Sequence, residues 1–247
     1  MSDLPNLRPE MRYGVPAADQ LIFNRYFTTG YSLYFRQAKW VLETVNSNKN
    51  PPPLGAWVDR MDNFRSDLRV PAMFRAELKD YVRSGYDRGH LVASANQRDE
   101  RYQNSETFLL SNMSPQLPEQ NRRIWRDLEQ KVRELDADDD ILETFVICGP
   151  IFDFRRVVEI LGDPNGDDIT IPIPHAHFKS ILAEDHRGKL KCYSFIIPNE
   201  ATVNDKSLEE YLVPTEEVEY KAGLFLWDSI EGSDAAALKK SRGRAWW

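Results

Sequence analysis

The stretch Asn-Arg-Arg-Ile-Trp-Arg-Asp-Leu-Glu at residues 121–129 carries the clearest structural signal in this chain. Pro118 and Glu119 lie just before it and favour the start of a helix. Apolar side chains then recur at intervals of three or four residues, which is the spacing of one helix face. These apolar residues are Ile124, Leu128, Val132 and Leu135. The sequence therefore predicts an amphipathic helix, which the acidic run at 134–143 brings to an end.

Asn121 and Glu129 are polar residues at the two ends of this stretch. In a regular α-helix they are about 80° apart around the axis, on the side that carries Trp125, and about 12 Å apart along it. Both side chains can therefore serve one site, but direct coordination of one ion by both is strained. We predict that Asn121 is a direct metal ligand and that Glu129 acts through water. Taken alone, the first residue is typical of a helix cap and the second of a solvated side chain.

His90 closes the upstream segment Ser-Gly-Tyr-Asp-Arg-Gly-His at residues 84–90. Histidine is the side chain whose ordinary pKa suits general-base catalysis near neutrality. The two glycines allow the backbone to approach a ligand closely, and Arg88 offers a planar fork that suits phosphate. A turn with a surface salt bridge is the alternative interpretation of this segment.

The other histidines and the two cysteines have simpler interpretations. His186 lies in a polar turn and is predicted to be solvated. His175 and His177 share one face of a strand and could begin a zinc site, but no further zinc motif completes it. Packing or hydrogen bonding is therefore favoured for both. Cys148 and Cys192 are predicted to be buried thiols, with a single disulfide as the alternative.

Short apolar segments separated by Gly, Pro and Asp turns predict strands along much of the chain. These segments are 31–35, 39–42, 89–94, 108–112, 145–148, 169–173, 177–182 and 193–197. A polar loop is predicted at 96–105 and an amphipathic piece at 208–218. The pattern predicts an α+β fold with helices flanking a mixed, mainly antiparallel central sheet. No linker divides it, so residues 1–247 are predicted to form one domain with flexible ends at 1–11 and 239–247.

The charge of the chain is unevenly distributed. The 247 residues include 39 Asp and Glu against 32 Lys and Arg, a net charge of −7, which argues against a polyanionic partner. Residues 60–133, however, contain 14 Lys and Arg and 11 Asp and Glu, a net charge of +3. The segment around His90 therefore has the sign that phosphate contacts need, and weak binding with steep inhibition by salt is predicted. No apolar run approaches the roughly 18 residues of a membrane span.

The segments around His90 and Asn121 together resemble the DNA/RNA non-specific endonucleases with a ββα-metal site, and most closely the endonuclease G branch. The likeness is strongest at 85–91 and 108–129, which hold Asp-Arg-Gly-His, Ser-Asn-Met-Ser-Pro-Gln and the Asn-Trp-Leu-Glu spacing. It covers most of the chain. The resemblance implies a metal-dependent hydrolase that cuts phosphodiester bonds in DNA and RNA and leaves 5′-phosphate and 3′-hydroxyl ends.

The same resemblance implies roles for individual residues. His90 is the general base that activates water, and Asn121 holds one Mg²⁺, which Mn²⁺ can replace. Glu129 belongs to the catalytic group by orienting the water around the ion. The other implied site residues are Arg88 and Asn112 in catalysis, Arg88, Arg133 and Arg60 in substrate binding, and Asp87 as a supporting residue.

Partners and location are implied in the same way. DNA and RNA are the substrates, and a homodimer and a protein inhibitor are expected. The implied location is mitochondrial for a eukaryotic chain, with a secreted or bacterial effector role as the alternative. An exonuclease of the same fold and a catalytically idle binding module are the alternatives for function.

Three features depart from this branch. His175-Ala176-His177 stands where a Thr/Ser-His pair is usual, so no catalytic role passes to these histidines. Residues 61–64 lack the cysteine that is common upstream of the catalytic strand. Relatives also tend to be basic, which this chain is not.

Overall fold

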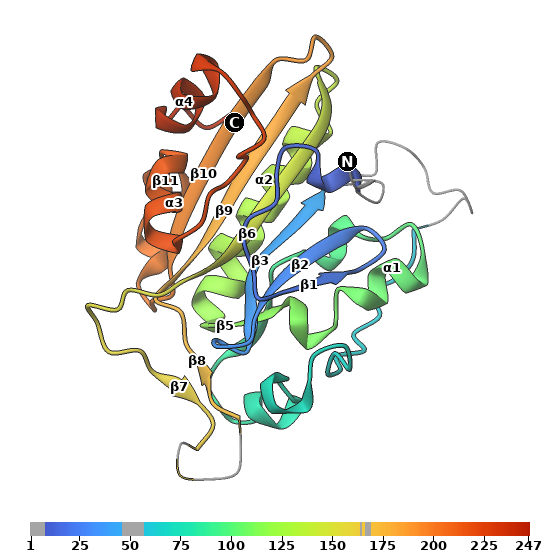
Figure 1. The fold of residues 1–247 in the computed structure, drawn as a ribbon, viewed down its shortest axis with the longest axis vertical. Helices are drawn as coiled ribbons and strands as arrows, with labels where there is room; N and C mark the ends of the chain where they lie inside the picture. The colour runs from blue at the N-terminus through green and yellow to red at the C-terminus, as the bar shows by residue number, and fades with distance from the viewer. Residues whose placement is uncertain (1–7, 46–56, 164, 166–168) are drawn as a thin grey trace, which may run out of the picture.

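A seven-stranded antiparallel sheet forms the centre of the molecule in the computed structural model, which describes residues 8–45, 57–163, 165 and 169–247 (Figure 1). The strand order is β1-β2-β3-β6-β9-β10-β11. The strands are β1 Gln20–Phe23, β2 Phe27–Ser32, β3 Gln37–Thr44, β6 Ile141–Ile151, β9 Ala176–Asp185, β10 Leu190–Pro198 and β11 Leu212–Val213. Helices cover both faces, so the predicted α+β fold with a mainly antiparallel central sheet is confirmed.

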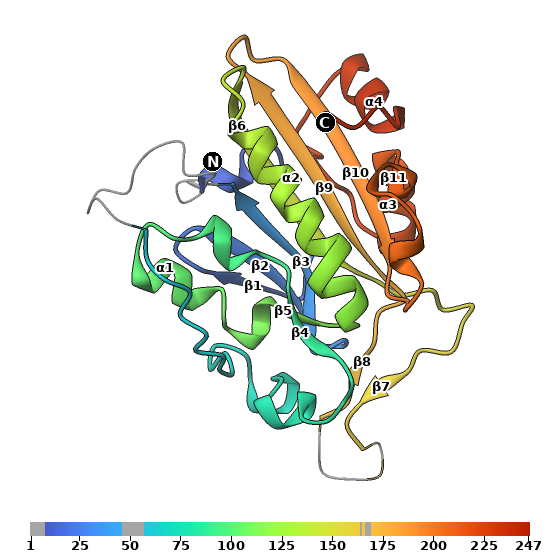
Figure 2. The same cartoon turned by 180° about the vertical axis from the view of Figure 1, so that it is seen from behind.

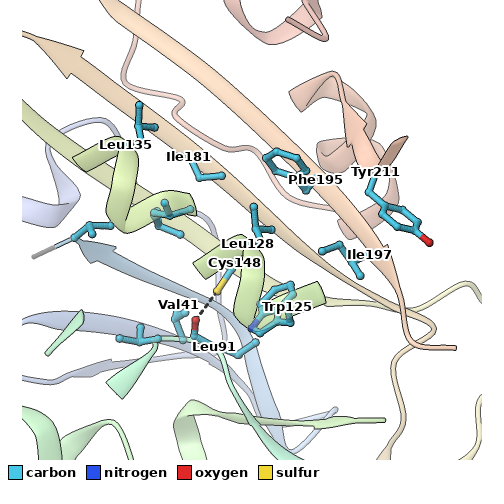
Figure 3. Packing of buried hydrophobic residues seen from close by; sticks show 14 of the residues in the cluster. Val41, Leu91, Trp125, Leu128, Leu135, Cys148, Ile181, Phe195, Ile197 and Tyr211 are labelled. Atoms are coloured by element: carbon cyan, nitrogen blue, oxygen red, sulfur yellow. Dashed lines mark hydrogen bonds between the residues drawn. The ribbon is translucent and has the colours of Figure 1, made fainter. Parts of the chain in front are cut away.

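Each face of the sheet packs into its own apolar core. Helix α2 (Arg126–Asp136) lies across one face, which is turned towards the viewer in Figure 2. Helices α3 (Thr215–Ala222) and α4 (Ser233–Lys240) pack on the other. The four apolar residues predicted for the helix face, Ile124, Leu128, Val132 and Leu135, are all buried. Figure 3 shows Leu128 of this face among buried residues of the sheet, which confirms the predicted amphipathic helix.

One long excursion of the chain separates two neighbouring strands of the sheet. Strand β3 pairs with β6, so residues 45–140 leave the sheet and return beside the strand they left. The described part of this excursion holds α1 (Arg101–Glu106), β4 (Asp87–His90), β5 (Met113–Gln116) and α2. It also holds 3₁₀ turns at Ala72–Phe74, Leu78–Tyr81, Ser94–Asn96 and Leu110–Asn112. Every residue predicted to act in a site lies within this excursion.

Strands β4 and β5 pair antiparallel, but β4 only overlaps the start of its predicted position and β5 lies just after the position predicted for it. The predicted strand at 89–94 ends at His90, and the one at 108–112 is a turn that precedes β5. The reason is Asn112, whose side chain accepts a hydrogen bond from Val92 N at 3.0 Å and donates one to Val92 O at 3.0 Å. These bonds satisfy backbone groups that a longer ladder would otherwise use. The predicted polar loop at 96–105 likewise contains most of α1, which begins with a capping box.

The helix that follows β5 is not a regular α-helix. It begins near Pro118 as predicted, but Gln120–Trp125 is π-helical and only Arg126–Asp136 is α-helical. The separation expected from a regular α-helix therefore does not apply to Asn121 and Glu129. Asn121 is not a helix cap either, because its N–H already bonds to Leu117 O at 2.9 Å. Single turns of π-helix are frequent at functional sites.

Two further predictions need correction. Residues 169–173 contribute only β8 (Ile171–Pro172), which pairs with β7 (Ile160–Leu161) outside the main sheet. The piece at 208–218 is broken by Pro214 into the 3₁₀ turn Leu208–Tyr211, β11 and the start of α3. Further 3₁₀ turns lie at Pro9–Met11 and Val203–Asp205.

Parts of the two ends expected to be flexible pack against the rest of the chain. Glu10 and Met11 are buried. At the other end, Trp246 packs against the core and donates a hydrogen bond to Lys131 O at 3.1 Å, which ties the last residues to α2. Residues 1–7 lie outside the described part of the chain. No helix within the described residues is long and apolar enough to cross a membrane.

Candidate active site

A cavity of about 670 Å³ lies between the β4–β5 pair and the helix that follows it. Of the residues predicted for the site, all but one line this cavity: Arg60, Asp87, Arg88, His90, Asn121, Glu129 and Arg133. The exception is Asn112, which is fully buried and bonds to backbone groups of Val92 and Thr107. Asn112 therefore holds the segment after β4 in place instead of facing the cavity.

His90 is the last residue of β4, and its backbone is fixed from two sides. Trp125 Nε1 donates to His90 O at 3.2 Å, and Cys148 Sγ donates to the carbonyl of the next residue, Leu91, at 3.0 Å (Figure 3). The imidazole meets the edges or faces of Phe64 and Phe108, with ring centroids 5.5 and 5.0 Å away. The ring is therefore held by packing, and its Nε2 has no partner among the described residues.

The surroundings of His90 keep its imidazole neutral. Burial is the main cause, and the positive charges of Arg60 and Arg88 add to it, so that the pKa of His90 falls to about 3. A neutral imidazole has a lone pair that can accept a proton. The site therefore holds a base that is ready at neutral pH.

The side-chain amide of Asn121 is oriented by Asp87. Asn121 Nδ2 donates to Asp87 Oδ2 at 2.9 Å, and Arg122 donates to both carboxylate oxygens at 2.8 and 2.7 Å. Burial raises the pKa of Asp87, but these hydrogen bonds outweigh it and hold the pKa below its ordinary value. An ionised carboxylate only accepts hydrogen bonds, so the amide nitrogen must face it. The oxygen of Asn121 is thereby left free to act as a ligand.

Glu129 lies on α2 among several cations. Burial raises the pKa of Glu129, while the charges of Lys179, Arg133 and Arg60 act in the opposite direction. Lys179 comes from β9, is almost completely buried, and has its Nζ 4.5 Å from the centroid of the Trp125 ring. It supplies positive charge behind the carboxyl group, on the side away from the cavity.

Two of the arginines lie on aromatic rings. The guanidinium carbon of Arg88 is 4.0 Å from the centroid of Phe64, and that of Arg60 is 4.8 Å from the centroid of Phe108. Such stacking leaves the edge of a guanidinium open to an anion, although two nitrogens of Arg60 already donate to Asp62 and Ser94. Arg126 also lines the cavity. Four arginines against Asp87 and Glu129 give the lining residues a net positive charge.

The remaining histidines take no part in this cavity. His177 is buried, and its Nε2 lies 2.9 Å from Ser114 Oγ. His175 Nε2 lies 3.0 Å from Val157 O. His186 is exposed, as predicted, and lies 3.1 Å from Asp139 O. Both cysteines are free and buried, so the predicted thiols are confirmed.

The donor set fits a cation that takes few protein ligands. Within the described residues, no three His, Cys, Asp or Glu side chains are grouped to hold a metal. Beside Asp87, the lining residues with an amide or carboxylate oxygen are Asn121 and Glu129. Mg²⁺ prefers oxygen ligands and keeps several of its waters, so such a sparse set suits it.

Some residues that support this site carry no functional motif in the sequence. Ser94 lines the cavity and Asn96 lies beside it, and both bond to arginines, but Ser94 ends a predicted strand and Asn96 begins a predicted polar loop. Glu43 and Lys179 lie on strands of the main sheet, and no local pattern marks them. Their positions become evident only when the strands are placed behind α2.

The chain matches the DNA/RNA non-specific endonuclease family over residues 7–232. The mitochondrial endonuclease G of Caenorhabditis elegans is 31% identical over 94% of this chain and 75% of its own length. Human mitochondrial endonuclease G is 32% identical over 89% of this chain and 73% of its own length. The mitochondrial nuclease of Saccharomyces cerevisiae is 32% identical over 93% of this chain and 72% of its own length.

The fold is similar to a solved structure as well. A crystal structure of an EndoG/EndoGI complex, described by its mechanism of EndoG inhibition, has a TM-score of 0.82 and 31% identity. The likeness covers 96% of each chain, and so includes both the central sheet and the excursion that builds the cavity. In sequence and in fold, the chain belongs to the DNA/RNA non-specific endonuclease family.

Proposed function

We propose that the chain is a divalent-metal-dependent nuclease that hydrolyses phosphodiester bonds within DNA and RNA and leaves 5′-phosphate and 3′-hydroxyl ends. One observation carries the proposal. A neutral histidine, an outward-turned amide oxygen and four arginines converge on one cavity. They supply a base, a cation ligand and positive charge, which are the three requirements of this hydrolysis.

The residues of the cavity divide the work between them. His90 takes a proton from the attacking water as the water oxygen bonds to phosphorus and the bond from phosphorus to the 3′-oxygen breaks. The departing 3′-oxygen takes up a proton from solvent and becomes the 3′-hydroxyl. Arg88, stacked on Phe64, binds the phosphate that is cut. Arg60 and Arg133 bind neighbouring phosphates. These contacts reach the backbone of the nucleic acid and not its base edges, so little sequence preference is expected.

Asn121 Oδ1 would hold Mg²⁺, or Mn²⁺ in its place, and Glu129 would reach the ion through water. When bound, the ion stabilises negative charge on the phosphoryl oxygens and on the departing 3′-oxygen. Asp87 keeps the amide of Asn121 turned towards the ion site. Glu129 orients water, which is the role that outer groups commonly have around a metal.

The proposed function is tested with closed circular plasmid and single-stranded RNA, each incubated with Mg²⁺ and with EDTA. We expect nicking of the circle and cleavage of the RNA with Mg²⁺, and neither with EDTA. Digestion of linear DNA alone would favour the exonuclease. No metal-dependent cleavage of any substrate would favour the idle binding module.

The acidic limb of the pH profile is expected well below pH 6.5, the ordinary pKa of histidine. Burial, Arg60 and Arg88 lower the pKa of His90, and only its neutral form accepts a proton, so activity persists as pH falls until His90 is protonated. Arg60→Gln removes a positive charge and should move the limb to higher pH. The measurement is kcat/KM from pH 2.5 to 8 at fixed Mg²⁺.

Burial raises the pKa of Glu129, so the profile is repeated with Glu129→Gln to remove this second titrating group. A limb that persists in this variant belongs to His90. An inflection near pH 6.5 that does not respond to Arg60→Gln would contradict the environment described for the imidazole.

We also propose a homodimer, a protein inhibitor and a mitochondrial location for a eukaryotic source. The inhibitor and the location are in keeping with relatives named as inhibited EndoG or as mitochondrial. A second cavity, of about 600 Å³, offers a surface for self-association because Phe35, Phe152 and the exposed Phe154 stack beside it. Light scattering tests the dimer: twice 28.7 kDa supports it, and 28.7 kDa alone contradicts it.

A further inference from the structure

The 3₁₀ turn Ser94–Asn96 holds two of the arginines that face the cavity. Arg60 Nη1 donates to Ser94 Oγ at 2.9 Å, and Arg133 Nη1 donates to Asn96 Oδ1 at 3.1 Å. Arg60 comes from the chain before β4 and Arg133 from α2, so they are far apart in sequence. The turn therefore gives each of two guanidinium groups one hydrogen-bond partner. Outside the turn, Arg60 Nε donates to Asp62 Oδ1 at 2.7 Å and Arg133 Nη2 donates to Gln130 Oε1 at 3.0 Å.

A carboxylate beneath the sheet face anchors this turn. Glu43 lies on β3 and is 1% exposed. Its Oε1 accepts from Asn96 Nδ2 at 3.0 Å, and its Oε2 accepts from Gln97 Nε2 at 3.0 Å. Two amide donors on two oxygens match an ionised carboxylate, which only accepts hydrogen bonds. The nitrogen of Asn96 must therefore face Glu43, and its oxygen is turned towards Arg133.

The charge of Glu43 is compensated within the same buried layer. Burial raises its pKa to about 7, and the positive charge of Lys179 and the two amide hydrogen bonds act against this rise. A buried carboxylate costs stability unless it is paired and hydrogen-bonded. Glu43 has both kinds of partner, and its hydrogen bonds run towards the cavity wall.

We propose that Glu43 is a positioning residue for substrate binding: through Asn96 it fixes the guanidinium of Arg133 where that group meets a backbone phosphate of the nucleic acid. The inference rests on the proposed function, because Arg133 is a phosphate-binding group only in a nuclease. It parallels the pair formed by Asp87 and Asn121, in which a carboxylate also fixes the direction of an amide oxygen.

The experiment measures DNA binding without cleavage, in a protein that carries His90→Ala. The affinity for a short duplex is followed by fluorescence anisotropy as salt is raised. Loss of one phosphate contact makes the slope of log K against log salt shallower by about 0.9. We expect this change for Arg133→Ala, for Glu43→Gln and for Asn96→Ala. Combining either of the last two with Arg133→Ala should change the slope no further.

Two controls separate positioning from general damage. Glu10 is another buried glutamate, and it accepts a hydrogen bond from Thr28 Oγ1 at 2.8 Å. For Glu10→Gln, the slope of log K against log salt should equal that of the parent. Glu43→Gln combined with Arg60→Ala should give additive losses, because Arg60 is held by Asp62 and Ser94 and not through Asn96. Thermal melts confirm that each variant is folded, and Asn96→Ala serves if Glu43→Gln is not.

The outcomes distinguish failure of the role given to Glu43 from failure of the proposed function. A folded Glu43→Gln or Asn96→Ala protein with an unchanged slope would overturn the inference, and so would full additivity with Arg133→Ala. If the parent protein binds duplex with a salt-dependent affinity, the proposed function survives either of these results. If the parent binds no nucleic acid at all, the proposed function fails, and the role of Glu43 fails with it.

Discussion

Replacement of His90 by alanine is expected to slow plasmid cleavage about a thousandfold, the middle of the range for losing a general base. The imidazole is the one neutral nitrogen base that lines the cavity within the described residues. Its loss leaves the arginines and the oxygen donors in place. The measurement is kcat/KM from initial rates of nicking at saturating Mg²⁺.

The fold should survive this change, because the bond from Trp125 Nε1 reaches the backbone carbonyl of His90 and not its side chain. His186→Ala is the matched control, since that imidazole is exposed and lies away from the cavity. We expect the control to cleave at the wild-type rate. A His90→Ala protein that cleaves as fast as wild type would remove His90 from the role of base.

Asn121→Ala is expected to raise the Mg²⁺ concentration for half-maximal activity by about a hundredfold. Even outer groups around a metal commonly contribute ten- to hundredfold to affinity, and Asn121 is proposed as the direct ligand. Asp87→Ala should act in the same direction with a smaller effect, because the amide stays but loses the carboxylate that orients it. Calorimetric titration with Mn²⁺ gives a readout that does not depend on cleavage.

Asn165→Ala provides the control for this series, since Asn165 is exposed and does not line the cavity. Its Mg²⁺ requirement should match that of wild type. An Asn121→Ala protein with unchanged Mg²⁺ dependence and unchanged Mn²⁺ affinity would show that the ion is held elsewhere. A loss of activity that Mg²⁺ cannot restore, with metal affinity intact, would assign Asn121 to substrate binding.

The parts of the fold that sequence predicts well are those that depend on local periodicity. The buried face through Leu128 and Val132 repeats every helical turn, so it is visible without any tertiary knowledge. The ends of β4 and β5 were misplaced because the amide of Asn112 bonds to Val92, twenty residues away in sequence. The π-helical turn was missed because its residues are compatible with an ordinary α-helix.

The same distinction between local patterns and tertiary placement applies to the residues of the site. His90, Arg88 and Asn121 lie in short, dense motifs, and a pattern in the sequence is enough to single them out. Glu43 and Lys179 do not, since each is one charged residue in an otherwise ordinary strand. Their importance comes from the pairing of β3, β6 and β9, which brings them behind the cavity. Only an assembled sheet makes such residues visible.

The excursion at residues 45–140 also bears on the order in which the molecule folds. Strands β6, β9 and β10 pair with neighbours close along the chain, whereas the β3–β6 pairing must first close a loop of that length. The logarithmic part of this closure costs roughly 4 kcal/mol. The backbone amides of β6, β9 and β10 should therefore become protected from exchange first during refolding, and those of β4 and α2 later. Local unfolding of this segment would abolish cleavage while most of the sheet persists. Nuclease activity and global stability are then separable quantities.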